Sequence, residues 1–154
     1  MVYITIVTLG STNWEIAATD RGICGIRPQT TFAQAPENTF TQMAAQQLQS
    51  YWEGRLQTFA LPLDVQGTPF QQAVWSALQA IPYGQFLCYS QVAQLIGRPR
   101  AVRAVAHAIG QNPCLILIPC HRVLGKDGSL TGFSGGLDLK RQLLQLERIP
   151  YLNC

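Results

Sequence analysis

The chain has 154 residues, of which 47% are hydrophobic and 12% charged, which suffices for one ordinary domain or two small ones and excludes a disordered chain. No run approaches 18 apolar residues and no basic segment precedes the first apolar residues, so we expect a cytoplasmic protein without a membrane span or secretory signal. Five cysteines without a CxxC pair, together with only two histidines, argue against a disulfide framework and a zinc finger.

The net charge of +3 is unevenly distributed along the chain. Residues 1–83 carry three basic and five acidic side chains, a net charge of −2, whereas residues 84–154 carry eight basic and three acidic side chains, a net charge of +5. A basic half is typical of a protein that contacts a phosphate backbone, and it is equally typical of a solvated surface.

The first third of the chain alternates between apolar and polar residues. This alternation predicts three strands joined by turns into a small antiparallel meander, at residues 2–8, 14–19 and 22–26. The period then changes, and apolar residues spaced three and four apart predict a helix over residues 39–53. Residues 61–65 are typical of a short edge strand.

A second domain is predicted to begin near Gly67. Thr68 is suited to an N-cap and Pro69 to the first helical position, and a helix with apolar residues at helical spacing follows until Pro82. We therefore expect two domains, at residues 1–66 and 67–154.

Two short helices joined by a glycine-containing turn resemble a helix-turn-helix. The first is expected over residues 89–96 and the second, which is rich in alanine, over residues 100–109. A small-residue helix can approach a DNA groove closely, and three nearby arginines could meet phosphates, namely Arg98, Arg100 and Arg103. The alternative is an alanine-rich core helix whose arginines face water.

Four aliphatic residues, 115–118, and a proline precede Cys120. This run predicts a buried strand that ends at the proline, with an exposed thiol and the imidazole of His121 at its exit. An Asp-Gly pair at 127–128 then indicates a hairpin or wing, and a leucine stripe predicts a final helix over residues 137–148.

Cys120 has two interpretations. A buried structural cysteine is common, whereas a nucleophile needs a nearby cation or base to lower its pKa, and His121 and Arg122 offer both. Adjacent side chains of extended backbone point to opposite sides, so a turn or a bridging water would be needed to join thiol and imidazole. In the last helix, Glu147 could orient His121, or it could pair at the surface with Arg141 or Arg148.

These residues resemble a known family. Pro119 to Val123, Gly110 to Pro113 and Ser134 to Gly136 together are similar to the signature of the methylated-DNA-[protein]-cysteine methyltransferases, over residues from about Gly67 to Glu147. The resemblance implies an α+β protein. Its N-terminal domain would be a small antiparallel sheet with a helix, ribonuclease H-like, and its C-terminal domain would be of the winged-helix or helix-turn-helix type.

The resemblance also implies roles for single residues. Cys120 would accept the alkyl group, His121 would activate it through a water, and Glu147 would orient the histidine. Tyr89 would contact the flipped base and its 3'-phosphate and donate a proton to the departing guanine. Arg103 would enter the base stack in place of the extruded nucleotide.

Further positions match the family's DNA-contacting and pocket residues. The DNA-binding set would add Arg98, Arg100, Ala101, Ala104, Asn112 and Arg122, with Asn112 joining the recognition helix to the active-site strand. The substrate pocket would comprise Tyr89, Ile109, Val123, Phe133 and Ser134. The carbonyls of Cys120 and Val123 would read the exocyclic amine of guanine, and the amide of Ser134 would face the oxygen that loses its alkyl group.

The implied activity is DNA repair by irreversible, stoichiometric transfer from 6-O-alkylguanine in double-stranded DNA to Cys120. We expect a monomer without cofactor, metal or membrane contact, since Cys24 alone is available where some members bind zinc. Phe133 replaces a frequent tyrosine and Leu115 a frequent proline, and the preferred alkyl group is not predicted. Two rivals remain at this point: a lesion-binding protein without transfer activity, and a cysteine hydrolase, which would turn over repeatedly.

Overall fold

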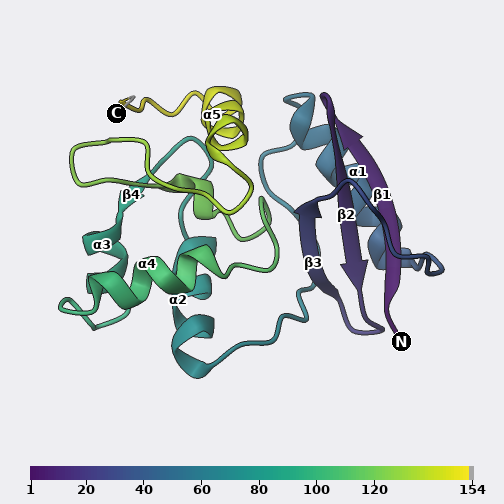
Figure 1. Cartoon of the computed structure of the whole chain (residues 1–154), viewed down its shortest axis with the longest axis horizontal. Coiled ribbons are helices and arrows are strands. Elements are labelled where there is room, and N and C mark those ends of the chain that lie inside the picture. The colour runs from purple at the N-terminus through teal and green to yellow at the C-terminus, as the bar shows by residue number, and fades with distance from the viewer. Residues whose placement is uncertain (153–154) are drawn as a thin grey trace. The chain divides into compact units, whose positions relative to one another are not determined.

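The computed structural model describes residues 1–152, and Asn153 and Cys154 lie outside this description. The chain forms two compact units, Met1–Gln66 and Gly67–Cys154, each with its own elements (Figure 1). No helix in the described part of the chain is long and apolar enough to cross a membrane.

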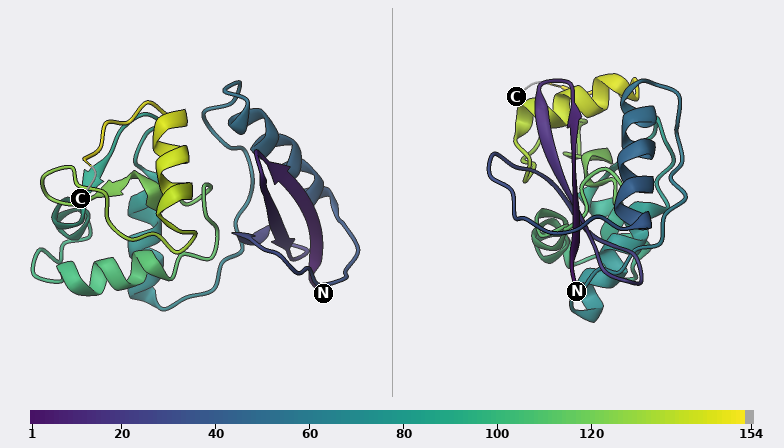
Figure 2. Two further views of the ribbon diagram at one scale, coloured as in Figure 1. Left: turned by 45° about the horizontal axis from the view of Figure 1, so that its top comes forward. Right: turned by 90° about the vertical axis from the view of Figure 1, so that its right-hand side faces the viewer.

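The first unit is a three-stranded antiparallel sheet covered by one helix. The strands β1 (Tyr3–Leu9), β2 (Thr12–Ala18) and β3 (Ile23–Pro28) pair in sequence order, and α1 (Thr39–Trp52) runs along one face (Figure 2, right). Side chains at alternating positions of β2, among them Trp14 and Ile16, are fully buried. The expected meander and helix are thereby confirmed.

The segment predicted as an edge strand, residues 61–65, forms only one bridge. Leu63 pairs in parallel with Ile23, whose amide donates to the carbonyl of Pro62 over 2.8 Å and whose carbonyl accepts from Asp64 over 2.8 Å. Pro62 has no amide proton, so the pairing cannot extend into a ladder.

The second unit is mainly helical. It contains α2 (Pro69–Gln79), α3 (Tyr89–Leu95), α4 (Val102–Gly110) and α5 (Leu137–Leu146), and a two-residue parallel pair of β4 (Leu87–Cys88) with β5 (Val123–Leu124). Thr68 caps α2 through a reciprocal pair of hydrogen bonds with Gln71, and Pro69 occupies the first turn as predicted. Trp75 of α2 donates to the carbonyl of Ala108 in α4 over 2.9 Å, which fixes the two helices together.

The apolar run before Cys120 is not a strand, so this prediction is wrong. The amide of Leu117 donates to the carbonyl of Leu115 over 3.0 Å, and Ile116 between them has φ 76°, which together define a γ-turn. The side chain of Asn112 holds this turn by donating to the carbonyl of Ile118 over 2.7 Å and accepting from the amide of Cys114 over 2.9 Å. A short apolar run indicates that a segment is buried but does not fix its conformation, which here depends on tertiary hydrogen bonds.

The hairpin predicted at the Asp-Gly pair is not formed among the described residues. Asp127 and Gly128 lie in a turn closed by the amide of Gly125, which donates to the carbonyl of Ser129 over 2.9 Å. Beyond the turn the backbone does not pair with β5. The strand β5 pairs with β4, and Ser129 forms a bridge with Leu152. The Asp-Gly pair therefore makes a turn without the ladder of a hairpin.

Candidate active site

Cys120 lies at the start of a short 3-10 helix, Cys120–Arg122. Its amide donates to the carbonyl of Ile118 over 2.8 Å, across Pro119, so two tight turns in succession lead to the thiol. The residue is 3% exposed, and the expected exposed position is therefore wrong. Because the backbone is helical here and not extended, the side chains of Cys120 and His121 do not point to opposite sides as they would in a strand.

Burial governs the thiol. It raises the pKa of Cys120 to about 11, although a hydrogen bond with Asn112 and the positive charge of Lys140 act in the opposite direction. The thiol is consequently protonated at neutral pH, contrary to the lowered pKa expected from His121 and Arg122. A base must remove the proton when substrate is present.

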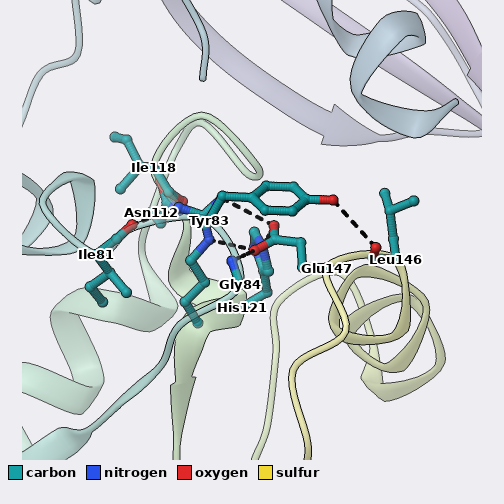
Figure 3. Close-up of polar contacts among 9 residues, drawn as sticks. Ile81, Tyr83, Gly84, Asn112, Ile118, His121, Leu146 and Glu147 are labelled. Atoms are coloured by element: carbon teal, nitrogen blue, oxygen red, sulfur yellow. Dashed lines mark hydrogen bonds and ion pairs between the residues drawn. The ribbon is translucent and has the colours of Figure 1, made fainter. Parts of the chain in front are cut away.

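His121 is suited to be that base. Its side chain is completely buried, and Nε2 lies 2.6 Å from Oε2 of Glu147 (Figure 3). A carboxylate only accepts hydrogen bonds, so Nε2 carries the proton and Nδ1 keeps its lone pair. Among the described residues Nδ1 has no hydrogen-bond partner. Burial lowers the pKa of His121 against the opposing effect of Glu147, which favours the neutral, basic imidazole.

Arg122 holds Glu147 from the other side. Its Nε donates to Oε1 over 2.8 Å and its Nη2 to Oε2 over 3.1 Å, while Nη1 donates to the carbonyl of Ile81 over 2.7 Å. The amide of Gly84 adds a bond of 3.2 Å to the same carboxylate (Figure 3). Arg122 is buried and each of its side-chain nitrogens donates a hydrogen bond to Glu147 or Ile81, while its role in DNA binding stays a prediction.

The end of α5 positions Glu147. The helix ends at Leu146, two residues earlier than predicted, with Glu147 as its C-cap and Arg148 at φ 59°. The amide of Ile149 donates to the carbonyl of Leu144 over 2.9 Å, which ends the helix in a Schellman motif. The surface pairing considered for Glu147 is excluded, because its side chain is fully buried and Arg141 pairs instead with Asp138 over 2.7 Å.

Two residues beside the thiol were missed by sequence reasoning. Lys140 is 1% exposed, and its Nζ donates to the carbonyl of Val123 over 2.8 Å. Burial lowers the pKa of Lys140 to about 8, and a thiolate at Cys120 acts in the opposite direction. Thr131 accepts from this ammonium and contacts the hydroxyl of Tyr89 over 2.8 Å. The sequence could have pointed to Lys140 through its position among the buried leucines of the last helix. No sequence pattern pointed to Thr131.

The helix-turn-helix residues divide between the interior and the surface. In α4, Val105, Ala108 and Ile109 are buried, and Ala101 before its first turn is half-buried. Exposed side chains form the opposite face and the preceding turn, namely Arg98, Arg100, Arg103 and Ala104. The alanine-rich helix thus supplies a core face and a basic outer face, and neither of the two interpretations alone describes it.

The remaining expected residues are distributed in the same way. Asn112 is buried and braces the turn between α4 and Cys120, and its place in the DNA-binding set stays a prediction. Of the expected pocket residues, Val123 and Ile109 are buried, Phe133 is half-buried and Ser134 is exposed. Residues 1–152 contain no cluster of three or more histidine, cysteine or acidic side chains arranged to hold a metal ion.

The pKa values predict which thiol reacts first in the DNA-free protein. Burial raises the pKa of Cys88, but a hydrogen bond from Ser90 and backbone donors together bring it below its ordinary value. We expect a soluble alkylating reagent at neutral pH to label Cys88 before Cys120, and the rate at Cys120 to rise about tenfold with each pH unit until its pKa is approached. Peptide mapping by mass spectrometry measures both rates. Fast labelling of Cys120 that does not depend on pH would contradict the buried, protonated thiol.

Both parts of the chain match domains of one known protein family. Residues 69–149 match the family described as 6-O-methylguanine DNA methyltransferase, DNA binding domain, and residues 12–65 match its ribonuclease-like domain. A methylated-DNA–protein-cysteine methyltransferase of Haemophilus influenzae is 55% identical over 104 residues, which are 67% of this chain and 58% of that protein.

Solved structures are similar over nearly the whole chain. The O6-methylguanine methyltransferase of Mycobacterium tuberculosis has a TM-score of 0.87 at 39% identity, covering 96% of this chain and 93% of the other. A second structure, of Mycobacterium tuberculosis OGT in complex with DNA, has a TM-score of 0.84 at 39% identity, covering 97% and 94%.

Proposed function

The chain belongs to the 6-O-methylguanine DNA methyltransferase family, and we propose that it repairs 6-O-alkylguanine in duplex DNA by transferring the alkyl group to Sγ of Cys120. The observation that carries this proposal is the buried pair of His121 and Glu147 directly after the buried Cys120 in the chain, in which Nδ1 of His121 has no hydrogen-bond partner among the described residues and can take a proton. We further propose that the protein acts in the cytoplasm as a monomer without cofactor or metal.

The transfer is a displacement at carbon. His121 Nδ1 takes the thiol proton through a water, and Glu147 stabilises the resulting imidazolium. The thiolate forms a bond to the alkyl carbon as the bond from that carbon to the guanine oxygen breaks, and the electron pair passes to the purine. Tyr89 gives the purine a proton. A donor aimed at the oxygen, the amide of Ser134, lowers the barrier by meeting this developing charge.

The buried thiol explains why the reaction needs a flipped base. Cys120 is 3% exposed, so a guanine stacked in a duplex cannot present its alkyl carbon to Sγ. Rotation of the nucleotide costs a few kcal/mol in stacking, which pocket contacts and an inserted side chain offset. The product is a thioether without a bond that water can break, so each chain acts once.

The exposed face of α4 is the proposed DNA contact. Arg98 and Arg100 would meet phosphates, and Ala101 and Ala104 would allow the helix to approach the minor groove. The complex of the Mycobacterium tuberculosis protein with DNA supports a DNA partner for this chain. An excess of lesion duplex separates the activity from a lesion-binding protein, because repair stops at one alkyl group per chain whereas a lesion-binding protein transfers none. A cysteine hydrolase would instead turn over repeatedly on an ester or peptide.

Replacement of Arg103 tests the proposed base flipping. We expect Arg103→Ala to slow transfer from duplex DNA by at least about tenfold, because nothing then fills the space of the extruded nucleotide, and to leave reaction with the free modified base nearly unchanged. Arg100→Ala is the matched control, which should weaken binding and reduce its salt dependence by the contribution of roughly one phosphate. Single-turnover rates on both substrates measure the effect. Equal losses on duplex and free base would contradict the role of Arg103.

A further inference from the structure

Three polar side chains from separate segments of the second unit form a continuous chain beside the thiol. Nζ of Lys140 in α5 lies 3.4 Å from Oγ1 of Thr131, and this oxygen lies 2.8 Å from the hydroxyl of Tyr89 at the start of α3. Once Cys120 loses its proton, the thiolate charge raises the pKa of both end groups, Tyr89 and Lys140. The mechanism above uses Tyr89 and leaves the other two residues without a role.

The donors in this chain have a direction. An ammonium group only donates, and Lys140 directs its protons to the carbonyl of Val123 over 2.8 Å, the carbonyl of Thr131 over 3.3 Å and Oγ1 of Thr131. Oγ1 accepts from Lys140 and still has one proton of its own, so either hydroxyl can donate in the contact with Tyr89. When Thr131 donates, the phenol proton is not used within this contact and can point to a bound base.

We propose that Thr131 is a positioning residue for the transfer to Cys120. Its hydroxyl accepts a hydrogen bond from buried Lys140 and donates one to the oxygen of Tyr89, so that the phenol acts as a donor toward the departing guanine. The inference rests on the proposed function. It assigns to Thr131 and Lys140 the orientation of Tyr89 and the supply of its proton.

The proton balance of the step closes within the site. As Tyr89 gives its proton to the purine, the hydroxyl proton of Thr131 moves to the phenolate oxygen, and Lys140 returns a proton to Thr131. Lys140 is then a neutral amine, while the thiol proton rests on His121, so the net charge of the site is unchanged. Burial, which lowers the pKa of Lys140 to about 8, favours this donation over that of a surface lysine.

A double-mutant cycle tests the inference. We expect Thr131→Val, which keeps the shape and removes the hydroxyl, to slow single-turnover transfer at saturating methylated duplex on the order of tenfold. The dissociation constant for the same duplex should change by less than about twofold, because the hydroxyl of Thr131 is engaged with Tyr89 and Lys140 and is outside the proposed DNA-binding set. Thr131→Ser should restore the rate. In a Tyr89→Phe background, which is itself slow, Thr131→Val should have no further effect.

The cycle distinguishes the possible outcomes. An equal slowing by Thr131→Val with and without the phenol, or no slowing at all, would overturn the inference. Thr131→Ala repeats the comparison if valine lowers the melting temperature. Transfer by the unaltered protein is measured in the same experiment, and its absence would overturn the proposed function and this inference with it, whereas normal transfer with an additive cycle overturns the inference alone.

Discussion

Cys120→Ala is expected to abolish alkyl transfer completely while DNA binding stays close to that of the unaltered protein. The thiol forms the new bond, and its interactions with Asn112 and Lys140 place it within the candidate site. Affinity for the lesion duplex should change by less than about threefold, because phosphate contacts from the exposed arginines dominate it. Loss of one buried sulfur should lower the free energy of unfolding by about 1 kcal/mol. Transfer of labelled methyl groups and a binding titration measure the two effects.

Cys24→Ala is the matched control. Cys24 is half-buried in β3 of the first unit, whereas the residues of the candidate site belong to the second unit, so this variant should transfer normally. A Cys120→Ala protein that still cleared the lesion would contradict the assignment of the acceptor.

Glu147→Gln is expected to have the second largest effect, on both stability and rate. Glutamine removes the charge that neutralises Arg122, and an uncompensated buried charge costs about 3–5 kcal/mol. It also removes the carboxylate that stabilises the imidazolium of His121, so transfer should slow by about a hundredfold. Urea unfolding and single-turnover kinetics measure the two losses. Asp138→Asn, in an exposed pair with Arg141, is the control and should change stability by less than about 0.5 kcal/mol.

A double variant separates the two roles of Glu147. Arg122→Met combined with Glu147→Gln removes the unpaired charge, so stability should recover in part. The rate should remain low, because His121 still lacks its carboxylate. Recovery of both properties together would show that Glu147 acts on the fold alone.

The helices and the meander could be predicted because their signals are local. Thr68 and Pro69 mark the start of α2, and alternation marks the strands, whose side chains divide between a buried and a less buried face. The turn at Ile116 could not be predicted, because its conformation depends on the side chain of Asn112 and on hydrogen bonds closed through space. The predicted hairpin was wrong for a similar reason, because β5 pairs with β4, a segment that is distant in the sequence.

The site residues that belong to a sequence motif could be predicted. The residues that act in the site because they are buried could not. The adjacent cysteine and histidine pointed to the chemistry, and the resemblance supplied Glu147. The burial of Arg122 was not foreseen, because an arginine in a basic half is ordinarily expected at the surface. Lys140 was overlooked for the same reason, although it lies among the core leucines of α5.

The most direct test of the central claim is the mass of the intact protein after incubation with an excess of duplex DNA that contains 6-O-methylguanine. The account predicts that every chain gains one methyl group in place of one hydrogen, that the gain stops there, and that peptide mapping places it on Cys120. Unchanged mass after prolonged incubation, a methyl group on another residue, or continued removal of lesions by chains already modified would contradict it.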